Sequence, residues 1–213
     1  MHRRKEQIAM GVDISGWIEC RRSFLREGET TPWQPAIRLG FLFHDRSYDA
    51  FGCLFGVRNY ANFRPVAEER GLPEDVSPAV REEYERWGEG VFGAGWITWA
   101  EIKAIDWEEP AELPDARIHR YRRAEDGSLI YEGKAAWDRD FAQAVDHSLI
   151  EGIFGTRTWP EGQEWEINGK VYRSVRLRRK DARPSWEVTF AVMEALARNY
   201  GDDGVRMIVW FSW

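Results

Sequence analysis

The stretch "VRMIVWFSW", residues 205–213, constrains the fold more than any other part of the sequence. It is almost wholly apolar, and a run of this kind is typical of a strand in the interior of a sheet. The residues before it, 186–200, place apolar side chains at helical spacing, with Ser185 as the expected N-cap and Gly201 after the last turn. The sequence therefore predicts a helix that leads into an interior strand, Val205 to Phe211.

Strand and helix signals alternate along the remaining sequence. Residues 8–20 and 33–40 have the composition of strands, and Pro35 favours a sheet edge for the second because proline donates no ladder hydrogen bond. Residues 47–57 place aromatic side chains at helical spacing, which predicts a helix with an aromatic inner face. Four further elements are expected: a helix capped by Ser77-Pro78, a strand at Trp96-Ile97, a brief helix behind the capping box Thr98–Glu101, and a helix within residues 138–155.

Two β-hairpins are predicted in the second half of the sequence. Asp126-Gly127 lies between strand-like runs in residues 117–136, and Asn168-Gly169 lies between such runs in residues 164–179. Both dipeptides suit tight turns that need positive φ angles.

The order of these elements predicts the fold class. Strands near both ends of the sequence, hairpins in the second half and helices between them are typical of an α+β fold. We expect a single domain over residues 1–213, in which helices pack on a mostly antiparallel sheet. The acidic, proline-containing segment 106–115 is expected to be an exposed loop.

Composition and charge exclude several classes of protein. Hydrophobic residues make up 43% of the chain, and no apolar run approaches the roughly 20 residues of a membrane span, which predicts a soluble protein without membrane association. The formal net charge of −6 argues against general DNA binding, because that affinity comes from neutralising phosphates. Asp13 and Glu19 interrupt any signal-peptide apolar region, so Cys20 and Cys53 are predicted to be reduced thiols in the cytoplasm.

Several segments together resemble a family of uncharacterised accessory proteins of actinobacteria and their phages. The shared pieces are an opening strand with a tryptophan, "GVRN", "RGLPEDVSPAVREEYERWG", "WITWAEI" followed by "DW", and "VRMIVWFSW" after a helix. The resemblance is best over residues 45–107, and the sequence departs from the family's Phe-Asp-Asn-like ending at Phe211-Ser212-Trp213. The family has no established activity, so the resemblance implies a phage accessory protein in the host cytoplasm and no mechanism.

Residues 57–60, Val-Arg-Asn-Tyr, carry polar and aromatic groups that helix packing alone does not require. Arg58 offers a planar fork of donors, Asn59 an amide for a base or ribose edge, and Tyr60 a stacking face. Twelve tryptophans in 213 residues supply further stacking faces. We expect Arg58, Asn59 and Tyr60 to line a pocket for a planar anionic ligand, with Trp96 or Trp99 opposite.

A purely structural role for these residues stays open. In that case Asn59 ends the preceding helix in a left-handed conformation, and Arg58 pairs with Glu68 or Glu69.

The run "RSVRLRRK" has two interpretations as well. If residues 170–179 form a strand, Arg176 and Arg178 share one face and could meet a phosphate of the ligand. Alternatively, these cations discourage unwanted pairing at an exposed sheet edge.

Evidence for catalysis is thinner, and no catalytic residue, metal site or cofactor is predicted. No motif of a hydrolase, P-loop or dinucleotide-binding enzyme occurs, and His44-Asp45 and Asp146-His147 are adjacent pairs whose side chains would diverge on a strand. The four histidines lack zinc-ligand spacing: His2, His44, His119 and His147.

Three function classes remain. The first is a non-catalytic phage accessory protein that binds a nucleotide-like anion and sequesters a host immune signal. The second is an interaction or inhibitor module whose partner is a host protein, and the third is a nucleotide hydrolase or transferase. Assembly into a homo-oligomer is open in each case.

Overall fold

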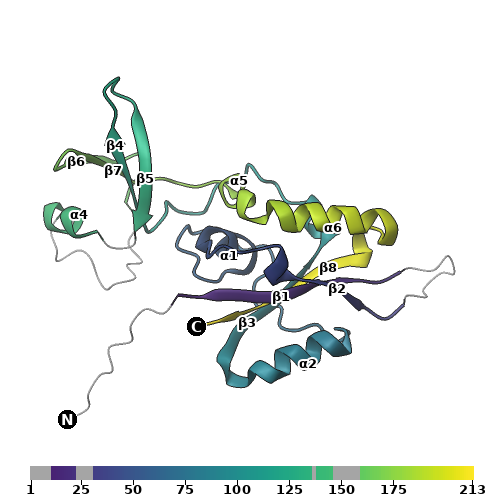
Figure 1. The fold of residues 1–213 in the computed structure, drawn as a ribbon. Coiled ribbons are helices and arrows are strands. Elements are labelled where there is room, and N and C mark those ends of the chain that lie inside the picture. The colour runs from purple at the N-terminus through teal and green to yellow at the C-terminus, as the bar shows by residue number, and fades with distance from the viewer. Residues whose placement is uncertain (1–10, 23–30, 136–137, 146–158) are drawn as a thin grey trace, which may run out of the picture. The chain divides into compact units, whose positions relative to one another are not determined.

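The computed structural model describes residues 11–22, 31–135, 138–145 and 159–213, and its fold is α+β (Figure 1). Within these residues every strand pair is antiparallel, which confirms the predicted class. The strands form two four-stranded sheets, whereas the sequence suggested one. Some predictions concern residues that the structure does not describe. These are His2, His147, residues 8–10 of the first strand, and residues 146–155 of the helix expected within 138–155.

The chain divides into two compact units, and each unit contains one sheet. The first unit comprises residues 1–47, 67–105 and 185–213, and the second comprises residues 48–66 and 106–184. Neither unit is a continuous piece of sequence, because the chain passes from one to the other four times. The single domain expected over the whole chain stays a prediction.

The sheet of the first unit has the strand order β2-β1-β8-β3. Its strands are β1 (Asp13–Cys20), β2 (Gln34–Arg38), β3 (Val91–Thr98) and β8 (Val205–Ser212). Strand β8 pairs with β1 on one side and β3 on the other, so its predicted interior position is confirmed. Strand β2 lies at an edge, as Pro35 indicated.

Strand β8 is covered on both faces, which explains why its sequence is an apolar run rather than an alternation. Figure 1 shows α2 (Pro78–Trp87) and α6 (Glu187–Tyr200) on opposite sides of this sheet. Ile208 and Trp210 pack against Val80 on the α2 side, and the rings of Trp210 and Tyr84 lie 5.6 Å apart. All seven residues from Val205 to Phe211 are buried.

Helix ends in the first unit follow the sequence signals in part. The capping box of α3 (Trp99–Lys103) is confirmed, since Thr98 Oγ1 accepts from Glu101 N–H and Glu101 Oε2 accepts from Thr98 N–H. Ser77 is the N-cap residue of α2 and Pro78 lies in its first turn, as predicted. The Ser77 side chain makes no capping hydrogen bond, however; its backbone N–H donates to Glu19 Oε1 at 2.9 Å, so a carboxylate from β1 holds the start of the helix.

The start of α6 also differs from the expectation, while its end does not. Trp186 rather than Ser185 occupies the N-cap position, because a short 3-10 turn precedes the helix. Gly201 ends α6 with a φ of 79°, as predicted. The 3-10 turns of the described chain are η1 (Leu39–Phe41), η2 (Gly88–Gly90), η4 (Arg183–Trp186) and η5 (Asp202–Gly204).

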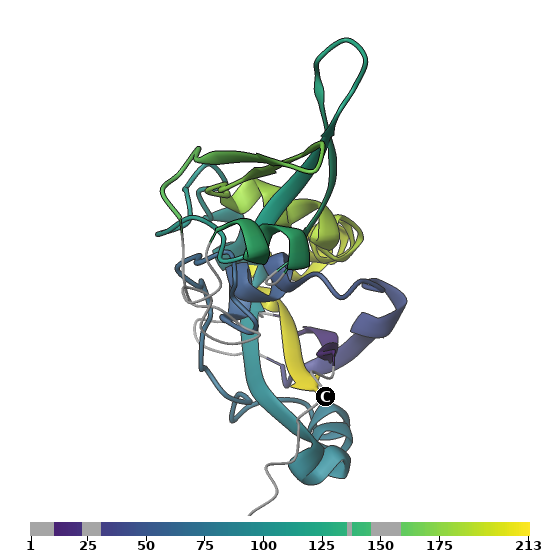
Figure 2. The same cartoon turned by 90° about the vertical axis from the view of Figure 1, so that its left-hand side faces the viewer.

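The sheet of the second unit has the strand order β5-β4-β7-β6. Its strands are β4 (Ile118–Arg123), β5 (Leu129–Ala135), β6 (Glu164–Ile167) and β7 (Lys170–Arg173). Both predicted hairpins form, and Figure 2 shows the longer β4–β5 hairpin projecting beyond its neighbours in the sheet. Asn168 and Gly169 both have positive φ angles, 52° and 74°, which suits a two-residue turn of type I′.

Strand β7 ends at Arg173, earlier than the hairpin over residues 164–179 predicted. Beyond it the backbone bonds to the segment 106–115, where Ala111 N–H donates to Leu177 O and Asp115 N–H donates to Val175 O, each at 2.8 Å. The side-chain alternation expected for a strand over 170–179 therefore does not extend past Arg173. Segment 106–115 was expected to be exposed, but these bonds draw Ala111 and Asp115 into the interior.

Three α-helices lie in the described part of the second unit. Helix α1 (Tyr48–Phe55) confirms the predicted helix, and its inner face includes Phe51 and Phe55. Helix α4 (Arg139–Ala144) begins after Asp138, whose carboxylate accepts from Phe141 N–H at 3.1 Å. The third is the short helix α5 (Arg179–Ala182).

Candidate functional site

A hollow of about 560 Å³ lies in the first unit, at the end of the sheet where β1 and β3 finish and β2 and β8 begin. We call it the Trp33 hollow. Its walls come from five parts of the chain: Arg21, Trp33, Pro73, Glu74, Asp75, Trp96, Thr98, Asp203 and Arg206. Its size is within the range of about 300–1,000 Å³ that small-molecule sites occupy.

Two guanidinium groups flank the indole of Trp33 in this hollow. The Cζ atom of Arg206 lies 3.9 Å from the Trp33 ring centroid, and that of Arg21 lies 4.4 Å from it. The indole N–H of Trp33 donates to Asp75 Oδ2 at 2.9 Å. Asp75 thus joins the ring to both cations, because it also accepts from Arg206 Nη1 at 2.7 Å and from Arg21 Nη1 at 3.4 Å.

Arg206 is buried, and a second carboxylate lies behind it. Its Nε donates to Glu19 Oε2 at 2.9 Å, and its Nη2 lies 2.8 Å from the same oxygen. Glu19 has no exposed side-chain surface, so the pair is a buried ion pair with both charges compensated. The cation is therefore fixed in place before any ligand arrives.

Asp75 stays ionised although its side chain is partly buried at the wall of the hollow. Partial burial alone would raise the pKa of this carboxyl, but the hydrogen bonds from Arg206 and Trp33 outweigh it and lower the pKa below its usual value. Glu74 and Asp203 are also exposed at the wall, and no described side chain forms an ion pair or hydrogen bond with either carboxylate.

Trp96, one of the tryptophans predicted to stack on a ligand, lines the Trp33 hollow. Arg70 lies over its ring at 5.0 Å and donates to Trp96 O at 3.2 Å. Arg70 is itself held by Glu101 at 2.8 Å. Partial burial would raise the pKa of Glu101, but hydrogen bonds from Arg70 and Thr98 lower it, so the carboxylate that orients Arg70 stays charged.

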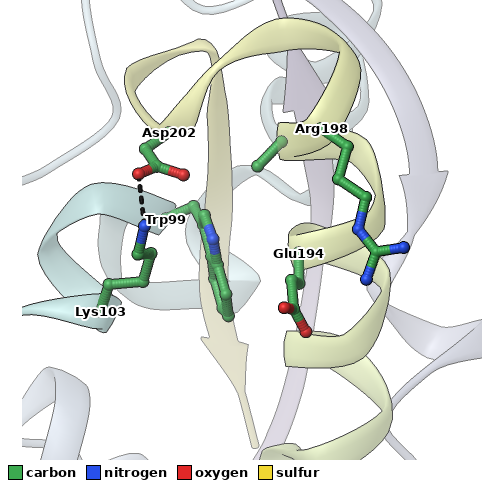
Figure 3. A pocket seen from close by; sticks show the side chains of 6 residues that line it. Trp99, Lys103, Glu194, Arg198 and Asp202 are labelled. Carbon is green, nitrogen blue, oxygen red and sulfur yellow. Dashed lines mark hydrogen bonds and ion pairs between the residues drawn. The ribbon is translucent and has the colours of Figure 1, made fainter.

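Trp99, the other predicted stacking residue, lines a separate hollow of about 300 Å³ (Figure 3). Figure 3 shows its indole between Lys103 on one side and Glu194 and Arg198 of α6 on the other. Lys103 Nζ donates to Asp202 Oδ2 at 2.6 Å across the rim. The indole itself is buried, so this hollow exposes little aromatic surface to a ligand.

Arg58, Asn59 and Tyr60 lie together in the second unit, just after α1. Arg58 Nη1 donates to Tyr60 Oη at 3.2 Å. Asn59 closes a local turn, since its Nδ2 donates to Phe63 O at 2.6 Å and its Oδ1 accepts from Phe63 N–H at 3.0 Å. The left-handed residue here is Arg58, with a φ of 51°, and not Asn59 as the structural alternative supposed.

This turn packs tightly against α1. A Cβ atom on Gly52 would lie 2.7 Å from Asn59 Cα, so the turn and the helix can meet only because Gly52 has no side chain. The predicted ligand contacts of Arg58, Asn59 and Tyr60 stay predictions. Trp96 and Trp99 belong to the first unit, so their predicted place opposite Arg58 also stays a prediction.

Arg176 and Arg178, also predicted to contact the ligand, hold the segment 106–115 in the second unit. Arg176 Nε donates to Ala111 O at 2.6 Å, and Arg178 Nη1 donates to Glu108 O at 2.7 Å. Main-chain carbonyls thus accept from part of each guanidinium group. These hydrogen bonds support a structural role for both arginines in addition to the predicted ligand contact.

A buried network of charges lies at the sheet of the second unit. Asp115 accepts hydrogen bonds from Arg117 Nη2 at 2.9 Å and from Lys134 Nζ at 2.8 Å, and His119 Nε2 lies 3.3 Å from it. Asp49 of α1 accepts from Lys134 at 2.6 Å and also pairs with Arg117.

The network keeps Asp115 and Arg117 ionised despite their burial. Burial alone would raise the pKa of Asp115, but His119, Arg117 and Lys134 hold it far below its usual value. Burial would lower the pKa of Arg117, and Asp115 and Asp49 raise it instead. Each charge of the network faces an opposite charge, so the arrangement suits structural stabilisation better than proton transfer.

Neither cysteine forms a disulfide, and both are buried. Burial is the main cause that raises the pKa of Cys20 and of Cys53, each to about 11. In Cys53 this effect outweighs the opposing influence of Arg179, whose Nη1 lies 3.8 Å from Sγ. Both thiols are therefore protonated and unreactive at neutral pH.

Searches against protein-family models, curated proteins and solved structures found no match to this chain. In the described part of the chain, no group of three or more histidine, cysteine or acidic side chains is arranged to hold a metal ion. None of the described helices has the length and apolar character needed to cross a bilayer.

Sequence reasoning missed Arg21, Trp33, Asp75 and Arg206, which form the centre of the Trp33 hollow. One signal could have pointed to it: Arg206 interrupts an apolar strand, and a buried cation needs a carboxylate partner. The sequence offers many acidic residues, however, and nothing local selects Glu19 and Asp75 among them.

Proposed function

We propose that this protein is a non-catalytic binder of a small planar molecule of the nucleotide type, which it takes up in the Trp33 hollow. The observation that carries the proposal is a hollow of about 560 Å³ in which the half-buried ring of Trp96 lies beside polar groups that are already fixed by one another. Aromatic walls with a few preorganised polar groups are what a small-molecule site requires.

The polar groups of the hollow support binding because they are held in place by one another. Asp75 is fixed by Trp33 and Arg206, and Arg206 is fixed by Glu19, so little side-chain entropy is lost when a ligand arrives. Trp96 is half-buried, which leaves part of its ring available to stack on a heterocycle.

The resemblance to actinophage accessory proteins indicates a biological role for this binding. A phage protein that binds a nucleotide without converting it would sequester a host immune signal. The sequestered molecule is then a nucleotide-like compound of the host cytoplasm.

Isothermal titration calorimetry with a panel of nucleosides and nucleotides tests the proposal. The wild-type protein should bind at least one member, and Trp96→Ala should weaken that binding by about 1–3 kcal/mol, the scale of one base–aromatic stack. Trp87→Ala serves as the matched control, because Trp87 is an exposed tryptophan of the same unit outside the hollow. Binding that is absent at millimolar concentration would exclude the proposed function.

The same titrations distinguish the Trp33 hollow from the site predicted around Arg58. If Arg58→Ala weakens binding by about 1.5–3 kcal/mol, the size of a charged hydrogen bond, and Trp96→Ala does not, the ligand lies in the second unit. Thermal melts of each variant separate lost binding from lost folding.

A second candidate function is a protein-interaction module. Exposed aromatic side chains favour it, since Phe41 is 71% exposed and Trp213 is 58% exposed. Trp213 stacks on Phe92 with ring centroids 4.7 Å apart, which gives a larger apolar surface than either ring alone. This function becomes the preferred proposal if no nucleotide or nucleoside of the panel binds. The partner would then be a host protein.

A further inference from the structure

We infer that the Trp33 hollow recognises its ligand through hydrogen-bond donors on the heterocycle and discriminates against each added phosphate group. The inference rests on the proposed function and names the part of the nucleotide that the site contacts. It follows from which polar atoms of the hollow already form hydrogen bonds within the protein and which do not.

The donors of the wall are largely used within the protein. Arg206 directs its guanidinium nitrogens to Glu19, to the Asp75 carboxylate and to Asp75 O. Trp33 donates its only side-chain hydrogen to Asp75, and Thr98 Oγ1 donates to Glu101 Oε2 at 3.0 Å. Arg21 is the donor with most capacity left, because its hydrogen bond to Asp75 is long and its side chain is 30% exposed.

The acceptors of the wall are largely unused. Glu74 and Asp203 are exposed at the hollow, and neither carboxylate has a hydrogen-bond partner among the described side chains. Asp75 is 56% exposed at its side chain, so it presents lone pairs beyond those that Trp33 and the arginines occupy. A ligand that enters the hollow therefore meets mainly ionised acceptors.

The net charge of the wall also favours a ligand that donates hydrogen bonds over one that carries phosphates. Three carboxylates and two guanidinium groups line the hollow, which gives the lining a net charge of −1. Glu19, buried behind Arg206, adds a further negative charge. Phosphate groups would be repelled, whereas the amino and imino hydrogens of a base would find ionised acceptors, and these make the stronger hydrogen bonds.

The ligand class that fits is a nucleobase or nucleoside with an exocyclic amino group, placed with that edge toward Asp75, Glu74 and Asp203. One phosphate can be tolerated where Arg21 reaches it. Further phosphates add like charge near the carboxylates, and each should weaken binding by about twofold to tenfold, the range for like charges roughly 10 Å apart near a protein surface.

Calorimetric titration of adenosine, AMP and ATP into the full-length wild-type protein tests the inference. Adenosine should bind most tightly and ATP least tightly, and the difference should shrink at high salt because surface charges are screened. Purine riboside, which lacks the amino group, should bind about tenfold or more weakly than adenosine, the loss expected for a hydrogen bond to a charged acceptor.

The double variant Glu74→Gln/Asp203→Asn makes the charge argument specific. It should raise the affinity for ATP relative to adenosine by about tenfold, since two repulsive charges are removed. Glu85→Gln is the matched control, because Glu85 is an exposed carboxylate of the first unit outside the hollow, and it should leave that ratio unchanged.

The possible failures are distinct. If wild type binds ATP more tightly than adenosine, or if the double variant leaves their ratio unchanged, the inference is overturned while the proposed function stands. If none of the four compounds binds the wild type, or if Trp96→Ala leaves the binding unaltered, the proposed function in this hollow fails and the inference fails with it.

Discussion

Each unit of this protein buries a network of charged side chains. The two networks differ in whether they reach the protein surface. In the first unit, the buried pair Glu19–Arg206 continues through Asp75 to the wall of a hollow, where further carboxylates are exposed. In the second unit, Asp115 and Asp49 are enclosed by Arg117, His119 and Lys134, and each group finds its counter-charge inside the network.

This difference distinguishes a network that only stabilises the fold from one that can also bind a ligand. A network whose charges are all compensated has no polar group left for a ligand, and removing one member leaves a buried charge without a partner. A network that ends at an open hollow keeps its buried part rigid and presents unused acceptors at its exposed part. We therefore expect substitutions of the buried charges in either network to change stability and substitutions of the exposed carboxylates at the hollow to change binding.

The largest effect is expected for Asp115→Asn. This change removes the charge that Arg117, Lys134 and His119 share, so the free energy of unfolding should fall by about 3–5 kcal/mol, as measured by urea denaturation. Glu125→Gln, at an exposed position of the same unit, is the control and should change it by less than about 0.5 kcal/mol. A loss below about 1 kcal/mol for Asp115→Asn would show that the network adds little stability.

Arg206→Met should have the next largest effect. It leaves Glu19 as a buried carboxylate whose remaining partner among the described residues is the Ser77 N–H, and we expect the free energy of unfolding to fall by an amount near the lower end of about 3–5 kcal/mol. The double variant Glu19→Gln/Arg206→Met should lose less than Arg206→Met alone, because no uncompensated charge remains. Equal losses in the single and double variants would contradict the assignment of a coupled ion pair.

Acidification should affect the second network strongly. The pKa of Asp115 is lowered in the folded protein, so the unfolded chain takes up protons first as the pH falls. The stability that Asp115 contributes is fully present above its unfolded pKa of about 3.9 and is lost as the pH falls through its folded pKa. Asp115→Asn should therefore flatten the loss of stability below about pH 4 by roughly 1–3 kcal/mol, measured by denaturation at several pH values. An unchanged pH profile would be inconsistent with this role.

The smallest effect on stability is expected at the hollow. Glu74→Gln and Asp203→Asn should each change the free energy of unfolding by less than about 0.5 kcal/mol, because neither carboxylate has a partner among the described side chains. Thermal melts of the single variants check this expectation. A loss above about 1 kcal/mol would indicate that the hollow is closed by contacts that involve these groups.

The fold was predictable where signals are local. The helical spacing before Gly201, the capping box of Thr98 and Glu101, and the turn Asn168-Gly169 each act within a few residues, and all three appear in the structure. Local reasoning also located Ser77 as the N-cap residue of α2, but it could not predict that the acceptor at this helix start comes from Glu19, 58 residues away.

The candidate site was predictable only in part. Trp96 was selected as a stacking residue, and it lines the Trp33 hollow. Arg21, Trp33, Asp75 and Arg206 were not selected, because they meet only where four strand ends come together. In the second unit, Asp115 was placed in an exposed loop, and only its hydrogen bond to Val175 O shows why the segment turns inward.

By itself, the sequence determined most of the helices and strands, the α+β class and the interior position of Val205 to Phe211. These depend on apolar periodicity and on backbone preferences that neighbouring residues set. The tertiary structure alone decided that the strands form two sheets and that Arg206 pairs with Glu19, 187 residues away in the sequence. A buried charge requires some partner, but packing chooses which one, because the cost of burial is the same whichever carboxylate compensates it.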